Sequence, residues 1–269
     1  MIIDFHTHVF PDKIAGKTID LLEKKSDLIP FSDGTVAGLE EKLKAAGVDY
    51  AVTLPVLTNP MQFDSVNRYA KEINEAFLDK KRRLISFAGI HPKCEDIDKK
   101  MAFIRESGFL GIKIHPDYQE TFINDDGYVR IMECAREYDL IVVTHSGVDA
   151  GYRDREVCCT AERVKELIRR VPHKKFVLAH CGLNEMFDEV LNTLCDEEVY
   201  FDTALVLSYI NKDTFMEILN KHGEDRMLFA TDSPWADIKE SVDFIRSLSL
   251  DKNTEEKLFF KNARKLLGI

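Results

Sequence analysis

The chain has 269 residues, of which 45% are hydrophobic and 31% are charged, and its formal net charge is −10. This composition supports a buried core, and the acidic charge argues against nonspecific binding to nucleic acid or to an anionic membrane surface. No run approaches the roughly 18 consecutive apolar residues of a membrane span, and the N-terminus shows no signal-peptide pattern. None of the six cysteines forms a C-x-x-C pair, so we expect a reduced, cytoplasmic protein.

Eight short apolar runs predict β-strands, and they are nearly continuous in apolar residues, as parallel strands covered on both faces are. In chain order these runs are Ile2–His6, Tyr50–Leu54, Leu84–Ile90, Leu110–His115, Leu140–His145, Phe176–His180, Val199–Thr203 and Met227–Asp232. The intervening and following segments have helical periodicity. They predict helices over Val36–Ala46, Ser65–Lys80, Asp96–Glu106, Tyr128–Tyr138, Ala161–Val171, Glu185–Leu194, Asp213–His222, Ile238–Leu248 and Asn253–Leu267.

The segment Val9–Thr35 follows the first strand and is the longest stretch without a clear periodicity. We expect it to carry a short helix around Ala15–Lys24. Because it leaves the end of a strand, it is expected to lie over the mouth of the fold as a partial lid.

The alternation of strands and helices predicts an α/β fold, either an open doubly wound sheet or a closed (β/α)8 TIM barrel. The count of eight strands favours the barrel, and so do the polar residues at the ends of nearly every strand. A barrel of this kind occupies about 250 residues as one domain. We therefore predict a single barrel domain over residues 1–269, with a metal site at the C-terminal ends of the strands.

The histidines support this placement, because six of the eight lie at or just after a predicted strand end. These six are His6, His8, His91, His115, His145 and His180. Strand ends of a barrel converge on one face, and imidazole is the commonest transition-metal ligand near neutral pH. The remaining two, His173 and His222, are expected at the surface or at helix ends.

His6 and His8 share one face of the first strand, because alternate side chains on a strand point to the same side. Two imidazoles on one edge can bind one ion, although two hydrogen-bonded strand histidines are the simpler alternative. His145, His180 and Asp232 each end an apolar strand and supply further ligands. A carboxylate with several imidazoles suits zinc, manganese or iron(II). The alternative role for Asp232 is that of a helix N-cap.

Lys113 and His115 face the same way on the fourth predicted strand. A lysine that points into a barrel mouth is costly unless it is paired. Lys113 therefore either binds an anionic substrate, carries a modification, or pairs with a carboxylate such as Asp202.

Together these motifs resemble the amidohydrolase superfamily, and more closely its branch of metal-dependent hydrolases, decarboxylases and lactonases. The resemblance runs through the whole chain and depends on the order of modest motifs on strands one, four, five, six and eight, followed by a closing helix. The motifs are Asp4-Phe5-His6-Thr7-His8, Gly111-Ile112-Lys113-Ile114-His115-Pro116, Thr144-His145-Ser146-Gly147, His180-Cys181-Gly182, Thr231-Asp232-Ser233-Pro234 and Lys261-Asn262-Ala263-Arg264-Lys265-Leu266-Leu267.

The resemblance implies a divalent metal, Zn2+ first and Mn2+ or Fe2+ as alternatives, held by His6, His8, His145 and Asp232. It implies that Asp232 also takes a proton from the attacking water. His180 is implied as an acid/base group or as a ligand of a second metal. Lys113 lies where hydrolytic relatives carry a carboxylated lysine that bridges two metals. We expect one ion with an unmodified Lys113 and two ions with a carbamate there.

The loops after the strands are expected to select the substrate. Arg153 either binds a substrate carboxylate or belongs to a solvated charged loop, and Trp235 is expected to wall the pocket. His115 and Lys113 are expected to face the substrate. We expect this substrate to be a small and anionic molecule, and we consider a homodimer as one assembly state.

The predicted function is metal-dependent hydrolysis of a small amide, lactone or ester by an activated water. The first alternative is a decarboxylase or hydratase on the same scaffold, because the ligands do not choose between these reactions. A metal-dependent DNase is a third interpretation, which Gly89-Ile90-His91-Pro92 fits and Lys113, in place of that family's glutamate, does not. A barrel that binds metal only structurally is the fourth.

Overall fold

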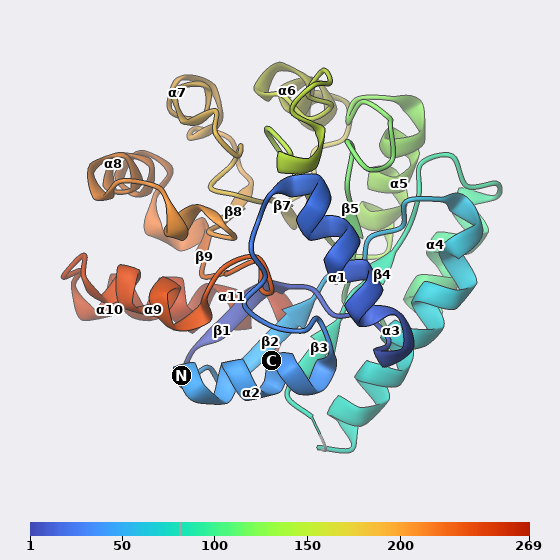
Figure 1. The fold of residues 1–269 in the computed structure, drawn as a ribbon. Coiled ribbons are helices and arrows are strands. Elements are labelled where there is room, and N and C mark those ends of the chain that lie inside the picture. The colour runs from blue at the N-terminus through green and yellow to red at the C-terminus, as the bar shows by residue number, and fades with distance from the viewer. Residues whose placement is uncertain (81) are drawn as a thin grey trace.

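The computed structural model describes residues 1–80 and 82–269, and it shows a ring of parallel β-strands enclosed by helices (Figure 1). The strands pair in chain order in two runs. The first run consists of β1 (Ile3–Thr7), β2 (Tyr50–Thr53) and β3 (Leu84–Ser86). The second run consists of β4 (Ala88–Gly89), β5 (Gly111–Ile114), β6 (Ile141–Thr144), β7 (Phe176–Leu178), β8 (Tyr200–Asp202) and β9 (Met227–Leu228).

Two seams join these runs into a closed ring. β3 and β4 are the two halves of the third predicted strand and are separated only by Phe87. At the other seam, the Phe5 N–H donates to the Phe229 carbonyl at 2.9 Å and the Asp232 N–H donates to the His6 carbonyl at 2.8 Å. The fold is therefore the predicted (β/α)8 TIM barrel, with both faces of each strand covered.

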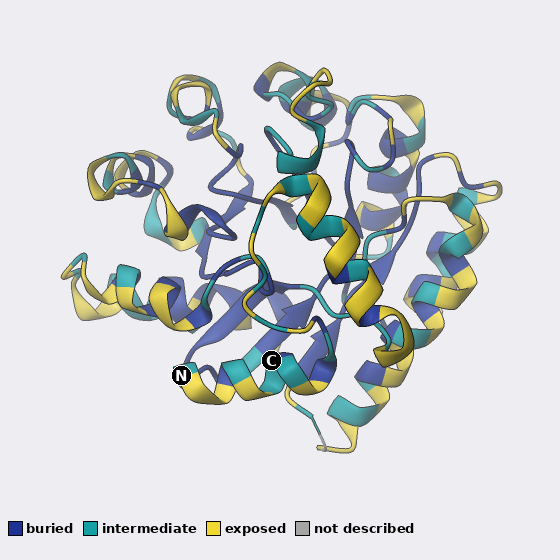
Figure 2. Cartoon of the chain, viewed as in Figure 1, coloured by how far each residue is buried: buried dark blue, intermediate teal, exposed yellow. Residues whose placement is uncertain are grey.

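The helices cover the outside of the ring and turn their buried residues toward the strands (Figure 2). In chain order they are α1 (Asp12–Ser26), α2 (Val36–Ala46), α3 (Phe63–Leu78), α4 (Ile97–Glu106), α5 (Asp126–Glu137), α6 (Ala161–Arg170), α7 (Phe187–Glu189), α8 (Lys212–His222), α9 (Ile238–Arg246), α10 (Lys252–Glu256) and α11 (Asn262–Leu267). Local signals set their ends. The Thr35 side chain accepts from the Gly38 N–H before α2, which ends at Gly47 with φ of 71°, as expected for a polar N-cap and a glycine C-cap.

Several strands end earlier than their apolar runs predicted. β7 ends at Leu178, whereas its apolar run continues to His180. The reason is that His180 and Cys181 adopt left-handed backbone, with φ of 62° and 54°. Asp232 does the same after β9, with φ of 69°. Such conformations are uncommon for residues with a Cβ atom and are often found at functional sites.

The two histidines that we predicted at the surface or at helix ends are both buried. His222 does end α8, yet it is only 3% exposed and stacks on Phe201 with 3.8 Å between ring centroids. His173 lies with its Nε2 atom 2.8 Å from the Leu140 carbonyl. In each case a ring that makes one backbone hydrogen bond fills core volume, so the surface prediction was wrong.

The segment after β1 crosses in front of the ring, where α1 is the helix nearest the viewer (Figure 1). At one end, Lys25 Nζ lies 3.4 Å from the ring centroid of Tyr152, in the loop after β6. At the other end, the Phe31 N–H donates to the Pro234 carbonyl at 2.7 Å, in the loop after β9. The segment thus spans the mouth of the barrel between two βα loops.

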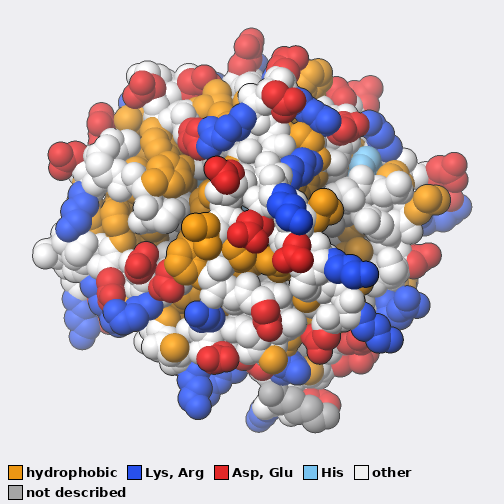
Figure 3. Space-filling model, in the orientation of Figure 1, with side chains coloured by type: hydrophobic (Ala, Val, Ile, Leu, Met, Phe, Trp, Pro, Cys, Tyr) orange, Lys and Arg blue, Asp and Glu red, His pale blue; other side chains and the backbone are white. Residues whose placement is uncertain are grey.

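The surface that carries α1 shows acidic and basic side chains interspersed with apolar ones, without a patch of a single sign (Figure 3). All six cysteines are free thiols. Within residues 1–80 and 82–269, we find no helix with both the length and the apolar character needed to cross a bilayer.

Candidate metal centre

Three predicted ligands converge at the seam where the barrel closes. His6 and His8 come from the end of β1, and Asp232 follows β9. His6 Nε2 lies 3.2 Å from His8 Nε2, and Asp232 Oδ1 lies 3.3 Å from the first and 3.0 Å from the second. His6 is buried, while His8 and Asp232 keep a small exposed fraction. The arrangement brings three potential ligand atoms to one point beside the barrel mouth.

The hydrogen-bond partner of each Nδ1 atom determines which nitrogen of the ring carries the proton. His6 Nδ1 lies 2.8 Å from Asp202 Oδ2, and His8 Nδ1 lies 2.8 Å from the Leu54 carbonyl. Asp202 also accepts two backbone N–H groups on Oδ1, so it acts here as an acceptor. Each ring therefore carries its proton on Nδ1 and presents a lone pair on Nε2.

Two imidazole lone pairs and a carboxylate oxygen within about 3 Å of one another repel unless a cation lies between them. Burial and the Lys113 ammonium lower the pKa of His6 well below its usual value, which keeps this ring neutral. Burial alone would raise the pKa of Asp232, but the His6 and His8 rings beside it lower that pKa to about 2. Two imidazole nitrogens and one carboxylate oxygen fit a divalent transition metal.

Lys113 lies beside these ligands, on β5, and is 1% exposed. Its Nζ atom is 3.1 Å from His6 Nε2. Burial lowers the pKa of the ammonium to about 8, while Asp202 and Asp232 act in the opposite direction. Asp202 binds the His6 ring directly and influences Lys113 only through its charge. The amine is thus a buried positive charge next to the candidate metal ligands.

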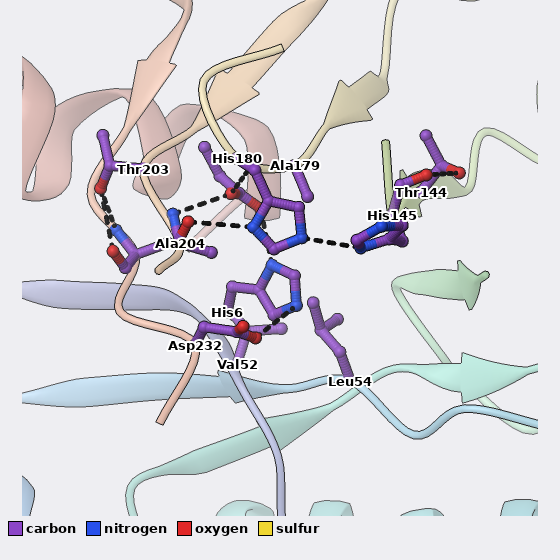
Figure 4. A network of polar contacts seen from close by, with 12 residues as sticks. His6, Val52, Leu54, Thr144, His145, Ala179, His180, Thr203, Ala204 and Asp232 are labelled. Atoms are coloured by element: carbon purple, nitrogen blue, oxygen red, sulfur yellow. Dashed lines mark hydrogen bonds and ion pairs between the residues drawn. The ribbon is translucent and has the colours of Figure 1, made fainter. Parts of the chain in front are cut away.

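His145, the fourth predicted ligand, is linked to the metal centre through the His180 ring. His180 Nδ1 lies 2.9 Å from the Ala204 carbonyl, and His180 Nε2 lies 2.9 Å from His145 Nδ1 (Figure 4). The ring centroids of His180 and His6 are 5.6 Å apart. His180 thus links the metal centre to His145, whose role as a metal ligand stays a prediction.

His145 instead belongs to a second group of potential ligand atoms, together with His115 and Asp149. Asp149 Oδ2 is 3.4 Å from His115 Nε2 and 3.9 Å from His145 Nε2. The two rings stack with 4.2 Å between centroids. The predicted substrate-facing residue His115 therefore lies next to a predicted metal ligand.

The two predicted loop residues lie further out. Arg153 is exposed and makes a two-pronged ion pair with Glu185, so its guanidinium is already occupied by a carboxylate. Trp235 is partly buried, and its backbone N–H donates to the Asp232 carbonyl at 2.8 Å. Their substrate contacts stay predictions. The N-cap alternative for Asp232 is wrong, because α9 begins at Ile238 and is capped by Asp237.

Asp149 was not among the residues predicted from the sequence, and Asp202 was predicted only as a partner for Lys113. Asp149 follows His145 by four residues, just after the turn at Gly147, and a carboxylate so close to a strand end was an available signal. Asp202 ends β8 and binds His6 Nδ1, a contact between residues 196 positions apart. A contact between residues so far apart in the chain cannot be predicted from the local sequence.

Comparisons with known proteins agree with this fold. The chain matches a family model described as amidohydrolase over residues 3–269. No match was found among curated proteins. An uncharacterised TIM-barrel protein from Bordetella bronchiseptica is similar, with a TM-score of 0.78, 16% identity, and coverage of 99% of this chain and 98% of that chain.

Two decarboxylases are also similar in structure. 5-Carboxyvanillate decarboxylase from Novosphingobium aromaticivorans, solved with manganese and 3-methoxy-4-hydroxy-5-nitrobenzoic acid, has a TM-score of 0.73 and 14% identity, over 100% of this chain and 97% of that chain. Dihydroxybenzoic acid decarboxylase from Polaromonas, solved with manganese and the inhibitor 2-nitroresorcinol, has a TM-score of 0.70 and 14% identity, over 99% and 96%. At these identities the likeness shows a shared fold.

Proposed function

The chain belongs to the amidohydrolase family, and from this membership we propose that it is a metal-dependent decarboxylase of a small hydroxylated aromatic acid. The observation that carries the proposal is the buried Lys113 amine, 3.1 Å from His6 Nε2 at the metal centre. A positive charge beside the metal ligands favours a substrate carboxylate at this place. The decarboxylases of similar fold were solved with hydroxylated aromatic compounds bound, which supports the same substrate class.

His6, His8 and Asp232 would hold the ion, and we propose Mn2+ or Zn2+, one per chain, with Lys113 unmodified. When bound, a divalent cation supplies the positive charge that attracts the substrate carboxylate and withdraws electron density from the ring. The Asp202 carboxylate and the Leu54 carbonyl keep both imidazoles oriented. We propose that residues 1–269 act as one barrel domain, and the free thiols fit a reducing, cytoplasmic setting.

Decarboxylation breaks the bond between the ring carbon and the carboxyl carbon, releases carbon dioxide, and leaves the ring carbon in need of one proton. We assign to Asp232 the relay of this proton from solvent, because its side chain keeps 9% exposure; the carboxylate is ionised at rest, so it takes up the proton only as it passes it to the ring carbon. His180 is the second acid/base group that we assign. Its Nδ1 atom faces the Ala204 carbonyl and its Nε2 atom faces His145 Nδ1, so a proton can pass between His180 and the His145 ring.

The test is an assay of the metal-loaded protein against 2,6-dihydroxybenzoate and 5-carboxyvanillate, with carbon dioxide release as the readout. A parallel panel of lactones, amides and esters measures hydrolysis. We expect carbon dioxide from at least one hydroxylated aromatic acid, and none from the His6→Ala variant. Hydrolysis without any release of carbon dioxide would overturn the proposal.

Hydrolysis of a small amide, lactone or ester is the second candidate. It is favoured by the ionised state of Asp232, whose pKa the neighbouring rings lower despite burial. A carboxylate in this state can accept a proton from water that attacks a carbonyl carbon. The same assay separates the two reactions.

A further inference from the structure

Leu205 lies in the loop after β8 and has an uncommon backbone conformation. Its dihedral angles are φ 63° and ψ −44°. The Val206 N–H donates to the Ala204 carbonyl at 2.7 Å, across Leu205. These angles and this hydrogen bond define a γ-turn with positive φ, which is the rare and strained form of the turn. A bulky residue with positive φ is an outlier, and such outliers are often found at functional sites.

We propose that this turn positions His180 and that Leu205 is therefore a positioning residue for the reaction. The Ala204 carbonyl, at the start of the turn, faces His180 Nδ1 at 2.9 Å (Figure 4). The inference rests on the proposed function, in which His180 is an acid/base group. Leu205 itself is an apolar residue outside all the motifs of the sequence.

One peptide unit connects the turn to both sides of the site. The Ala204 carbonyl and the Leu205 N–H belong to the same planar unit and point in opposite directions. The carbonyl faces His180, while the N–H donates to the carbonyl of Thr231 at 3.0 Å, one residue before Asp232. Rotation of this unit would break both hydrogen bonds at once.

Neighbouring groups hold the turn from both ends. Before it, the Ala204 N–H donates to Asp202 Oδ1 at 3.0 Å, and the same oxygen accepts the His180 N–H. After it, the Leu205 carbonyl accepts the Ser208 N–H at 3.0 Å and the Ser208 hydroxyl at 2.7 Å. The Leu205 side chain is buried. A strained conformation persists when its surroundings fix it in this way.

The turn determines which nitrogen of His180 carries the ring proton. A carbonyl oxygen can only accept, so the Ala204 carbonyl requires the proton to be on His180 Nδ1. The Nε2 atom, which lies 2.9 Å from His145 Nδ1, then carries the lone pair. With an ordinary negative φ at Leu205, the carbonyl would turn away and the ring could adopt either tautomer. The strain at Leu205 thus serves the orientation and the tautomer of His180.

Two substitutions separate this positioning role from a packing role. Leu205→Val keeps most of the apolar side chain, but a β-branched residue tolerates positive φ poorly. Leu205→Gly removes the side chain but adopts positive φ without strain. A positioning role predicts that the glycine variant resembles wild type more closely than the valine variant does. A role in packing alone predicts the opposite order.

The first readout is the tautomer of His180, measured by long-range proton–nitrogen NMR on the zinc-loaded protein with isotope-labelled histidine. The His180 signals are identified by their loss in His180→Gln. We expect the proton on Nδ1 in wild type and in Leu205→Gly, and a mixture of both tautomers in Leu205→Val. An Nδ1 proton that is fully retained in Leu205→Val overturns the inference.

The second readout is the rate of carbon dioxide release from the accepted aromatic acid. We expect kcat of Leu205→Val to fall about 10- to 100-fold, because a misplaced acid/base group loses much of its contribution. KM should stay near the wild-type value, because Lys113 and the bound ion attract the substrate carboxylate. Leu207→Val is the matched control and should equal wild type in both readouts. It makes the same change within the 3-10 turn Val206–Ser208, where the backbone is helical.

Circular dichroism and zinc content show whether each variant is folded. If Leu205→Val does not fold, Leu205→Ala replaces it in both readouts, because alanine has a Cβ atom without a branch. Equal results for Leu205→Ala and Leu205→Gly would then overturn the inference. Failure of the proposed function has a different signature. Wild type would release no carbon dioxide from any aromatic acid, while the tautomer of His180 would still differ between the variants.

Discussion

The metal centre and the neighbouring group of His115, His145 and Asp149, which we call the His115 cluster, each contain two imidazoles and one carboxylate, yet His115 differs from His6 and His8 in the hydrogen bond that its Nδ1 atom makes. The Nδ1 atoms of His6 and His8 face acceptors, which are the Asp202 carboxylate and the Leu54 carbonyl. The Nδ1 atom of His115 faces a donor, the Tyr118 backbone N–H. The first arrangement leaves lone pairs on Nε2, which suit a cation, whereas the second leaves a proton on Nε2 of His115. The same residue type can therefore act as a metal ligand or as a hydrogen-bond donor, according to the partner of its Nδ1 atom.

The largest effect that tests this contrast is the loss of a metal ligand. His6→Ala and His8→Ala each remove one of the converging lone pairs, and we expect metal affinity to fall by more than about 100-fold, beyond the loss from an outer-shell change. Activity should be lost with it, while circular dichroism shows a folded barrel. The comparison is His115→Ala, which should retain its metal. Equal metal loss in His115→Ala would erase the distinction between the clusters.

The next effect concerns the acceptor behind His6. Asp202→Asn keeps an oxygen for the backbone N–H groups of His180 and Ala204 but turns amide protons toward His6 Nδ1. We expect metal affinity to fall about 10- to 100-fold, because the ring no longer keeps its proton on Nδ1. Metal titration of Asp202→Asn against Asp149→Asn measures this. The contrast fails if the two variants bind metal equally well.

A smaller effect is expected at Lys113, which borders the metal centre rather than the His115 cluster. Lys113→Met removes a buried charge at similar volume, so we expect KM for an aromatic carboxylate to rise about tenfold, roughly the worth of one charge-assisted contact. Metal content should not fall, because the amine only abuts His6. An intact mass heavier by about 44 Da, as lysine carboxylation produces, would show instead that Lys113 helps to hold a second ion.

The smallest effect should come from the segment over the mouth, which touches the His115 side through Tyr152 and Tyr118. Lys25→Gln removes a cation held 3.4 Å from the Tyr152 ring centroid, a contact worth about 0.5–1 kcal/mol at an exposed site. Hydrogen exchange in α1 should therefore quicken about two- to fivefold, with metal content unchanged. Lys24→Gln, at a neighbouring exposed position, is the control. Equal acceleration in both variants would show that the contact between Lys25 and Tyr152 does not hold the segment over the mouth.

The sequence predicted the barrel because its signals are local and repeated. A short apolar run predicted each strand, and polar residues at the ends of the runs indicated the face that carries the site. The split of the third strand at Phe87 and the left-handed backbone at His180 escaped prediction. Both depend on how a strand meets its neighbours rather than on its own residues.

The site was predictable as a set of residues but not as a set of roles. The alternation of side chains along a strand placed His6 and His8 on one face, and the resemblance to a family added Asp232. The membership of His145 in the second group, and the presence of Asp149 there, became visible only in the structure.

The sequence by itself thus determined which imidazoles and carboxylates reach the mouth of the barrel, since strand periodicity and strand ends are local properties. Only the tertiary structure decided which nitrogen of each ring carries the proton. That choice depends on single hydrogen bonds such as His6 to Asp202, 196 positions away, and His8 to Leu54, 46 positions away. Closure of the barrel brings these partners together, and they fix which nitrogen of His6 and His8 is free to bind a metal ion.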